Sequence, residues 1–275
     1  MIKLKEIMDN VREKAPLVHN ITNYVTVNDC ANILLACGAS PIMSDDEGDV
    51  EDITSICGGL NINIGTLNKN TIPSMFLAGR RSNELGHPVL LDPVGAGASR
   101  IRTDTALRLI DELNLAVIRG NISEIKALYG DSSTTRGVDA DAADQVNASN
   151  IDSAISFAKA FSRNMGVVVA ITGATDIITD GEQVCCITNG DPMMSRVTGT
   201  GCMLSAMTTA FVVADPDNVF ESVCAATIAM GLAGEVAKSR LSDMDGNSTY
   251  RNYLIDAVCN MSGEQLEKGA KYEIR

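Results

Sequence analysis

The chain has 275 residues, of which 45% are hydrophobic and 21% charged, and its formal net charge is -13. This acidic balance disfavours nucleic-acid binding, which depends on neutralising phosphates, although a local basic pocket for one nucleotide stays compatible with it. We expect a single domain over residues 1–275, because no linker, charge block or repeat of solenoid period divides the sequence.

The N-terminal segment and the cysteines indicate a cytoplasmic protein. Residues 1–16 carry charges throughout, unlike a signal peptide, and the apolar stretch 222–234 is too short to span a bilayer. The eight cysteines lie in apolar surroundings without a C-x-x-C pair, which favours reduced core thiols. We therefore expect neither a membrane nor a nucleic acid as a partner, and two histidines do not indicate a zinc site.

Strand-like and helix-like segments alternate along the chain. Short β-branched or aliphatic runs occupy residues 16–22, 39–44, 60–65, 88–95, 115–121 and 166–173. Helical spacing occupies residues 27–37, 71–85, 103–113 and 151–164. This alternation predicts an α/β fold whose mainly parallel central sheet is flanked by helices on both faces.

Three further segments complete the expected organisation. Asp180-Gly181 lies between β-branched runs and predicts a hairpin, and hence an antiparallel edge of the sheet. The apolar segments that follow it predict two helices, rich in Ala, Gly and Met, that pack closely together. We interpret the acidic run 45–52 as a solvated loop, and the polar stretch 130–150 as a surface loop with a short helical turn.

Ligands of open α/β sheets bind outside the carboxyl ends of the strands, so polar residues at strand ends are candidates for a site. In "LLDPVGAGASR", Asp92 closes a strand before a glycine-rich loop. Asp, Pro and Gly are common turn formers, and a turn is one interpretation. The other is a carboxylate suited to Mg²⁺, which takes few protein carboxylates and keeps waters.

The next strand ends in "RGNISEI". Asn121 and Glu124 match a helix capping pair. Alternatively, Glu124 is a second acidic group near phosphate, and Arg119 contacts a nucleotide. At the end of a later strand, Thr172 and Gly173 could approach phosphate, although a threonine in a strand needs no function.

The first strand ends in a polar group of side chains that includes His19, Asn20, Thr22 and Asn23. The pair Thr26 and Asp29 predicts the N-cap of the helix at 27–37. At the end of the second strand, Met43 is either a core residue or a pocket wall.

The late segment "RVTGTGCMLSA" places Gly199 and Gly201 at the start of a helix. Free backbone N–H groups and the helix dipole favour an anion there. Neither "GAGASR" nor "GTGCML" completes the dinucleotide motif G-x-G-x-x-G, and the Walker motif G-x-x-x-x-G-K-[ST] is absent. Acidic strand ends with a G-T-G turn favour phosphoryl transfer on another α/β framework.

These motifs, in this order, resemble the hydroxyethylthiazole kinases of the ribokinase-like superfamily. The resemblance covers nearly the whole chain through "HNITNYV", "DPVGAGAS", "RGNISEI", "TGATDIITDG" and "GDPMMSRVTGTGCMLSA". The last motif is the most specific, because most ribokinase-like enzymes have an aspartate as base where this chain has Cys202. The loop 130–150 keeps "RGVDA" of the family but is otherwise unusually polar and acidic.

The resemblance implies ATP-dependent, Mg²⁺-assisted phosphorylation of the hydroxyl of 4-methyl-5-(2-hydroxyethyl)thiazole, in a homotrimer whose sites lie between subunits. By motif, Met43 and Gly199 would contact the thiazole, and Asn23 would lie on the substrate side. Arg119 and Thr172 would contact ATP. Asp92 and Glu124 would lie on the metal side, and the catalytic residues would be Cys202, Gly199 and Gly201.

The role of the thiol follows from the chemistry of phosphoryl transfer. The transition state is loose, so positioning and electrostatics dominate and the base only accepts a proton late. We expect the pKa of Cys202 to be lowered at the helix N-terminus. A small apolar residue filling the helix start is the structural alternative. Two other functions stay open: a related kinase of hydroxymethylpyrimidine, pyridoxal or a sugar, and a non-catalytic nucleotide-binding regulator.

Overall fold

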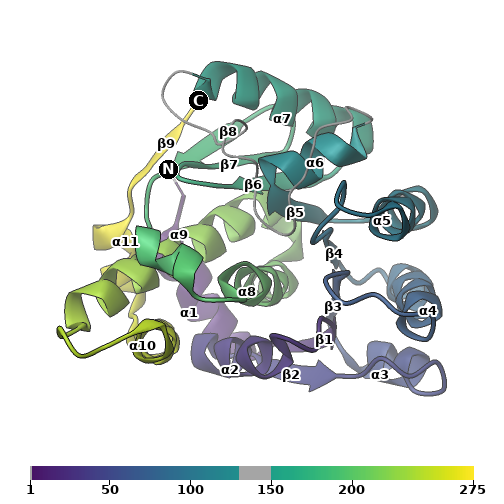
Figure 1. Ribbon diagram of the computed structural model, residues 1–275, viewed down its shortest axis with the longest axis horizontal. Coiled ribbons are helices and arrows are strands. Elements are labelled where there is room, and N and C mark those ends of the chain that lie inside the picture. The colour runs from purple at the N-terminus through teal and green to yellow at the C-terminus, as the bar shows by residue number, and fades with distance from the viewer. Residues whose placement is uncertain (1, 130–149) are drawn as a thin grey trace.

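The computed structural model describes residues 2–129 and 150–275. Within these residues, nine strands form one sheet (Figure 1). The strands lie across the sheet in the order β2 (Ser40–Met43), β1 (Leu17–Ile21), β3 (Gly59–Asn63), β4 (Val89–Asp92), β5 (Val117–Asn121), β6 (Val168–Thr172), β7 (Asp176–Thr179), β8 (Val184–Ile187) and β9 (Tyr272–Ile274).

The sheet is parallel from β2 to β6 and antiparallel from β6 to β9. The β7–β8 hairpin turns at Asp180-Gly181, and Gly181 has the left-handed φ of 94° that this turn requires. The predictions of a mainly parallel sheet and an antiparallel edge are confirmed. The strand β9, formed by the C-terminal residues, was not predicted and extends that edge.

Helices cover both faces of the sheet, as predicted (Figure 1). One layer consists of α3 (Val50–Ile56), α4 (Thr71–Glu84), α5 (Arg100–Glu112), α6 (Ile122–Leu128) and α7 (Ile151–Met165). The other consists of α1 (Leu4–Lys14), α2 (Val27–Cys37), α8 (Thr200–Ala214), α9 (Val219–Arg240), α10 (Asn247–Asn260) and α11 (Gly263–Gly269). Two short 3₁₀ turns, η1 (Pro192–Arg196) and η2 (Pro216–Asn218), flank α8.

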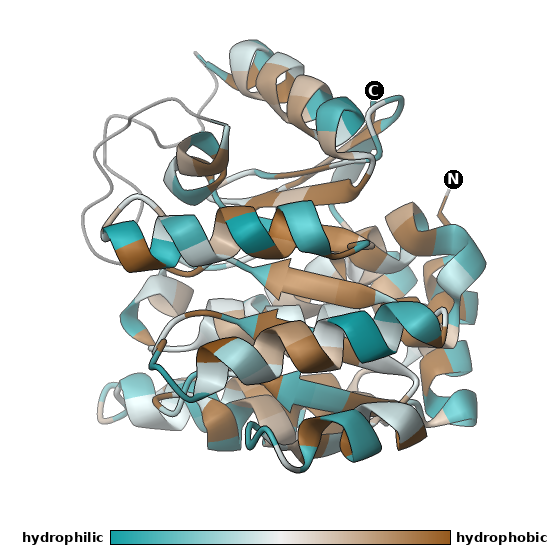
Figure 2. Ribbon diagram, turned by 90° about the vertical axis from the view of Figure 1, so that its right-hand side faces the viewer, coloured by the Kyte–Doolittle hydropathy of each residue, from teal (hydrophilic) through white to brown (hydrophobic). Residues whose placement is uncertain are grey.

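The sheet separates two hydrophobic cores, one under each helix layer. In Figure 2, which looks onto the α3–α7 layer, the strands visible between the helices are largely hydrophobic. Helices α8 and α9 have hardly any polar face, because α8 packs on the sheet and both are covered by further helices. They pack against each other, as expected from their small residues.

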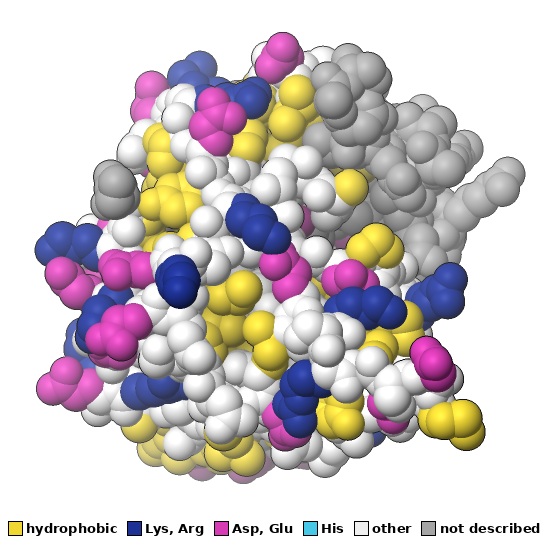
Figure 3. All heavy atoms as spheres, turned by 90° about the vertical axis from the view of Figure 1, so that its left-hand side faces the viewer, with side chains coloured by type: hydrophobic (Ala, Val, Ile, Leu, Met, Phe, Trp, Pro, Cys, Tyr) yellow, Lys and Arg dark blue, Asp and Glu magenta, His cyan; other side chains and the backbone are white. Residues whose placement is uncertain are grey.

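The apolar stretch 222–234 lies in α9, the second of the two predicted apolar helices. The segment Pro216–Arg240 has 25 residues and, by length and hydropathy alone, could cross a membrane; 67% of its 18-residue apolar window is buried inside the molecule. The prediction that this stretch is too short was therefore wrong on length. On the face shown in Figure 3, acidic and basic side chains are intermixed and hydrophobic side chains form scattered groups.

Two local predictions were only partly confirmed. The acidic run 45–52 is not a loop throughout, because α3 begins at Val50. Thr26 is the N-cap residue of α2, as predicted, but its side chain makes no capping hydrogen bond within the described chain. Its hydroxyl donates to Asn23 Oδ1 at 3.0 Å, and Asp29 pairs with Arg251 at 3.7 Å. The predicted loop 130–150 lies outside the described residues except for residue 150.

Candidate active site

The carboxyl ends of the parallel strands meet along one edge of the sheet, and strand alternation selects which side chains face α8. In β3 and β4, Asn63 and Asp92 are register partners, and both point to the α8 face because alternate residues of a strand share a face. Arg119 of β5 and Thr172 of β6 point the same way. The sheet thus presents four polar side chains to the start of α8.

Helix α8 begins with the glycine turn. Gly199 is its N-cap with a φ of 89°, and a β-carbon there would come within 2.4 Å of Thr26 Cγ2. No side chain caps this helix end within the described residues. The first N–H groups of α8, at Thr200, Gly201 and Cys202, lack partners within the helix, and the positive end of the dipole lies there. This helix start suits an anion.

The thiol of Cys202 is buried and held by two side-chain amides. Asn23 Nδ2 donates to Cys202 Sγ at 3.1 Å, and Asn63 Nδ2 donates at 3.3 Å. Asn23 is fixed in turn by Thr26, whose backbone N–H and hydroxyl both donate to Asn23 Oδ1. The thiol therefore has a defined position rather than simply filling space at the helix start.

The expected lowering of the thiol pKa was wrong. Burial raises the pKa of Cys202, and the negative charge of Asp92 raises it further. Hydrogen bonds from Thr26 and Asn23 and the charge of Arg119 act in the opposite direction but do not outweigh burial. Cys202 is consequently a mostly protonated thiol at neutral pH.

Asp92 is fully buried at the end of β4, and its two carboxylate oxygens differ in their hydrogen bonding. Oδ2 accepts hydrogen bonds from Ser205 Oγ at 2.7 Å and Asn63 Nδ2 at 3.0 Å, and Arg119 Nη1 lies at 3.5 Å. Oδ1 is buried without a hydrogen-bond partner in the described part of the chain. Burial raises the pKa of Asp92, while Arg119 opposes that rise.

Arg119 connects the strand ends across the site. Its Nη2 donates to Thr172 Oγ1 at 2.7 Å, and its side chain is 11% exposed. Gly201 lies directly against the guanidinium, since a β-carbon there would approach Arg119 Nη1 to 2.7 Å. Strands β5 and β6 and the α8 N-terminus therefore converge on one cationic group.

Glu124 is the N3 residue of a capping box at the start of α6, as the capping interpretation predicted. Asn121 Oδ1 accepts from Glu124 N, while Glu124 Oε2 accepts from Asn121 N at 2.8 Å. The other oxygen, Oε1, accepts from Gly95 N at 2.8 Å and so reaches the glycine-rich loop. Burial raises the pKa of Glu124 to about 7, and the nearby charge of Asp92 contributes.

The arrangement fits a hydrated divalent cation better than a protein-only metal cage. Among residues 2–129 and 150–275, no group of three or more His, Cys, Asp or Glu could hold a metal ion. Mg²⁺ needs only one or two carboxylates besides waters and phosphates. Asp92 Oδ1, which has no hydrogen-bond partner in the described part of the chain, could serve as such a ligand, and Glu124 is a second acidic group nearby.

Met43 lies apart from this cluster, at the end of edge strand β2. It is the register partner of Asn20 and packs, half-buried, against the core on the α8 side. A small hollow, open to solvent, lies nearby at the ends of β1 and β3. Its lining comprises Ile21, Thr22, Tyr24, Asp45, Asn63, Thr66, Asn68, Thr71 and Met75.

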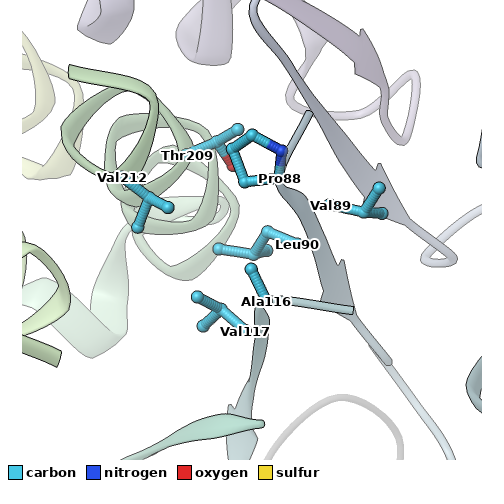
Figure 4. A pocket seen from close by; sticks show the side chains of 7 residues that line it. All are labelled: Pro88, Val89, Leu90, Ala116, Val117, Thr209 and Val212. Atoms are coloured by element: carbon cyan, nitrogen blue, oxygen red, sulfur yellow. The ribbon is translucent and has the colours of Figure 1, made fainter. Parts of the chain in front are cut away.

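A second hollow lies at the opposite edge of the sheet. It has an empty volume of about 150 Å³ between α8 and the amino ends of β4 and β5, and it has no room for a water molecule (Figure 4). Pro88, Leu90, Val117 and Val212 are among its apolar walls. It is a packing gap rather than a ligand site.

Two residues of the cluster were missed in the sequence. Asn63 was included in an apolar strand, although the rule that selected Asp92 applies to it equally, since it also ends a strand before a glycine. Ser205 lies one turn after Cys202 on the same helix face, which helical spacing could have revealed.

Comparison with known proteins decides the family. A family model described as the hydroxyethylthiazole kinase family matches residues 8–264. The chain belongs to the hydroxyethylthiazole kinase family. A hydroxyethylthiazole kinase of Clostridium acetobutylicum is 60% identical over 270 residues, which cover 98% of this chain and 99% of the relative. One from Clostridium beijerinckii is 50% identical over 267 residues, covering 97% and 95%.

Solved structures agree with this family assignment. The structure of a hydroxyethylthiazole kinase protein from Pyrococcus horikoshii OT3 has a TM-score of 0.89, is 34% identical and covers 100% of both chains. A pyridoxal kinase of Staphylococcus aureus has a TM-score of 0.61 at 15% identity, covering 94% of this chain and 98% of the other, and shares the fold alone. The ribokinase-like fold inferred from the motifs is confirmed.

Proposed function

We propose that this protein transfers the γ-phosphoryl group of ATP to the primary hydroxyl of 4-methyl-5-(2-hydroxyethyl)thiazole in thiamine biosynthesis or salvage, with Mg²⁺ as cofactor. The observation that carries the proposal is the position of Cys202. Its sulfur lies in the first turn of α8 and shares the donor Asn63 with the buried carboxylate Asp92. An anion site, a proton acceptor and a cation ligand thus lie together.

Each residue of the site would have a distinct chemical role in the reaction. The N–H groups of the Gly199–Cys202 turn would stabilise charge on the transferring phosphoryl group. Arg119, supported by Thr172, would bind the ATP phosphates. The thiolate form of Cys202, a minor species at neutral pH, would accept the proton of the alcohol late in the reaction. Mg²⁺, held by Asp92 and Glu124, would neutralise phosphate charge when bound.

We place the thiazole between Met43, Asn23 and Gly199, above the carboxyl ends of β1 and β2. The placement follows the family resemblance. Asn23 donates to the thiol and Gly199 is the N-cap of the helix that carries it, so an alcohol bound there would adjoin Cys202 Sγ. The hollow beside Asn63 lies at the same edge of the sheet, but none of these three residues lines it.

We infer, from the family resemblance, a single-domain cytoplasmic enzyme that forms a homotrimer with sites between subunits. The exposed Tyr24 and Val25, at 75% and 57%, lie next to the site and would be covered by a neighbouring subunit. Light scattering at assay concentration tests the assembly, and an active monomer would contradict it.

A coupled ADP-release assay tests the reaction, with hydroxyethylthiazole, hydroxymethylpyrimidine and pyridoxal compared side by side. We expect the highest kcat/KM with the thiazole alcohol. Equal or better turnover of the pyrimidine or of pyridoxal would favour a related small-alcohol kinase. ATP binding without turnover of any of the three would favour a nucleotide-binding regulator.

A further inference from the structure

The carboxamide of Asn63 uses all of its hydrogen-bonding capacity inside the site. Its Oδ1 accepts from Gly65 N at 2.9 Å and from Asn23 Nδ2 at 3.1 Å. Its Nδ2 donates to Asp92 Oδ2 at 3.0 Å and to Cys202 Sγ at 3.3 Å. The residue is 1% exposed, so these four bonds are made away from solvent.

The orientation of this amide is fixed by the backbone. The N–H of Gly65 can only donate, so it must face the carbonyl oxygen of Asn63 rather than the amino group. The amino group is thereby turned toward Asp92 and Cys202. Gly65 also allows the close approach, because a β-carbon there would lie 3.0 Å from Asn63 Oδ1.

The same amide determines which oxygen of Asp92 is available. Asn63, Ser205 and Arg119 all approach Oδ2. Three donors from three different elements hold one oxygen of this carboxylate. The carboxylate therefore cannot rotate freely about its Cβ–Cγ bond. Oδ1 is left as the oxygen without a partner within the described residues.

We propose that Asn63 is a positioning residue that couples the two halves of the site. One amide hydrogen holds Asp92 so that Oδ1 is presented to the divalent cation, and the other holds Cys202 Sγ beside it. The inference rests on the proposed function, because it takes Asp92 as a cation ligand and Cys202 as the proton acceptor. Removing the amide should therefore weaken cation binding and slow phosphoryl transfer together.

The test compares Asn63→Leu with Asn61→Leu. Asn61 is a matched control, because it is a buried amide two residues earlier on the same strand and face, and it donates instead to Asn20 Oδ1. Binding of Mn²⁺ in the presence of ADP is followed by the electron paramagnetic resonance signal of free Mn²⁺. Steady-state kinetics with ATP and hydroxyethylthiazole give kcat and KM separately.

For Asn63→Leu we expect Mn²⁺ affinity to fall by about tenfold or more and kcat to fall by about 10- to 100-fold, the range typical of groups that orient metal ligands. The KM for the thiazole should change by less than about threefold, and Asn61→Leu should keep all three values within about threefold of wild type. If the leucine variant does not fold, Asn63→Ala in the same assays decides the question.

Two results would overturn the inference. In the first, Asn63→Leu matches Asn61→Leu in both assays, and Asn63 is then a packing residue. In the second, kcat falls while Mn²⁺ affinity is unchanged, and Asn63 then does not position Asp92 for the cation. Failure of the proposed function is recognised separately, because wild type would then bind Mn²⁺ and ADP without phosphorylating the thiazole alcohol.

Discussion

Gly201 and the Arg119 guanidinium are in direct contact: a β-carbon on Gly201 would lie 2.7 Å from Arg119 Nη1. Gly201→Ala should therefore push the guanidinium away from Thr172 and Asp92. We expect KM for ATP to rise by about tenfold, which corresponds to the loss of one charge-assisted hydrogen bond. The control is Gly246→Ala, where no described atom lies within 4 Å of the added carbon. An unchanged KM would show that Arg119 does not bind the nucleotide.

Gly199 combines a left-handed backbone with a close neighbour, and these two effects can be separated. Gly86 has a similar φ of 72°, but no described atom lies within 4 Å of an added β-carbon. Gly86→Ala should cost about 1 kcal/mol of the free energy of unfolding, from backbone strain alone. Gly199→Ala should cost about 1–3 kcal/mol more, because the carbon overlaps Thr26. Equal losses in denaturant titrations would contradict the close contact.

The fold could be predicted well because its determinants are local and periodic. Each parallel strand is recognisable in the sequence as a short apolar run, and Asp180-Gly181 indicates the hairpin. The predictions failed for segments that are stabilised by residues distant in the sequence. The strand β9, Tyr272–Ile274, has only three residues and is ordered by pairing with β8. Helix α3 begins inside an acidic run, and its buried Val50 and Thr54 depend on packing against α4 and β1.

The candidate site was predictable where chemistry coincided with a strand end or a glycine turn, as for Asp92, Arg119 and Cys202. The side-chain hydrogen bonds of these three residues were not predictable, since they join residues 27 to 179 positions apart, such as Arg119 with Asp92 and Asn23 with Cys202. The pKa of Cys202 was misjudged for the same reason. The sequence indicates the helix N-terminus, whose dipole lowers a thiol pKa. Burial and the charge of Asp92, which raise the pKa of Cys202, are recognisable only in the structure.

Glu124 caps α6, and we propose that it also acts beside the divalent cation, so Glu124→Gln should affect both stability and turnover. The glutamine oxygen can replace only one of the two acceptors that serve Gly95 N and Asn121 N. We expect a loss of about 1–2 kcal/mol in the free energy of unfolding. Removal of the acidic group should also lower turnover and raise the Mg²⁺ concentration needed for half-maximal activity. Unfolding titrations beside Mg²⁺-dependent kinetics measure the two effects.

A capping box elsewhere supplies the control for Glu124. Ser262 and Gln265 form the same box at the start of α11. Gln265→Ala should destabilise the protein while leaving the response to Mg²⁺ normal. If Glu124→Gln behaves in the same way, Glu124 is only a cap and the metal assignment is wrong.

His19 should make stability depend on pH in the mildly acidic range. Its Nε2 donates to the carbonyl of Ser44 at 3.0 Å, since a carbonyl only accepts, so Nδ1 of the neutral ring accepts from Thr54 at 2.9 Å. Burial lowers the pKa of His19 below 6.5. As the pH falls through about 6.5, the unfolded chain therefore gains a proton before the folded protein does, and stability is lost.

The His19 effect is measured as a difference between two proteins. The free energy of unfolding of wild type should fall relative to that of His19→Gln between about pH 8 and about pH 5. Glu124 contributes with the opposite sign, because its raised pKa of about 7 favours the folded state at lower pH. That contribution is common to both proteins and cancels. Parallel stability curves would mean that the folded state keeps His19 protonated without cost.

Replacement of Cys202 tests the proton acceptor itself. Cys202→Ala should lose about 10²- to 10⁴-fold in kcat, the contribution of a positioned base, while ATP binding barely changes. The N–H groups of the glycine turn would support the residual activity. Because burial and Asp92 raise the thiol pKa, wild-type kcat should increase on the basic side of neutral pH.

Cys202→Asp should keep kcat or raise it, because an aspartate has a reference pKa of about 3.9 and nearly the same size. The nearby Asp92 opposes a second negative charge, whereas Arg119, the α8 N-terminus and bound Mg²⁺ favour it. The decisive measurement is kcat against pH for wild type and Cys202→Asp. The basic-side rise of wild type should vanish in the aspartate variant. If Cys202→Ala instead matches wild type in activity and pH profile, the thiol is only a packing group and another residue accepts the proton.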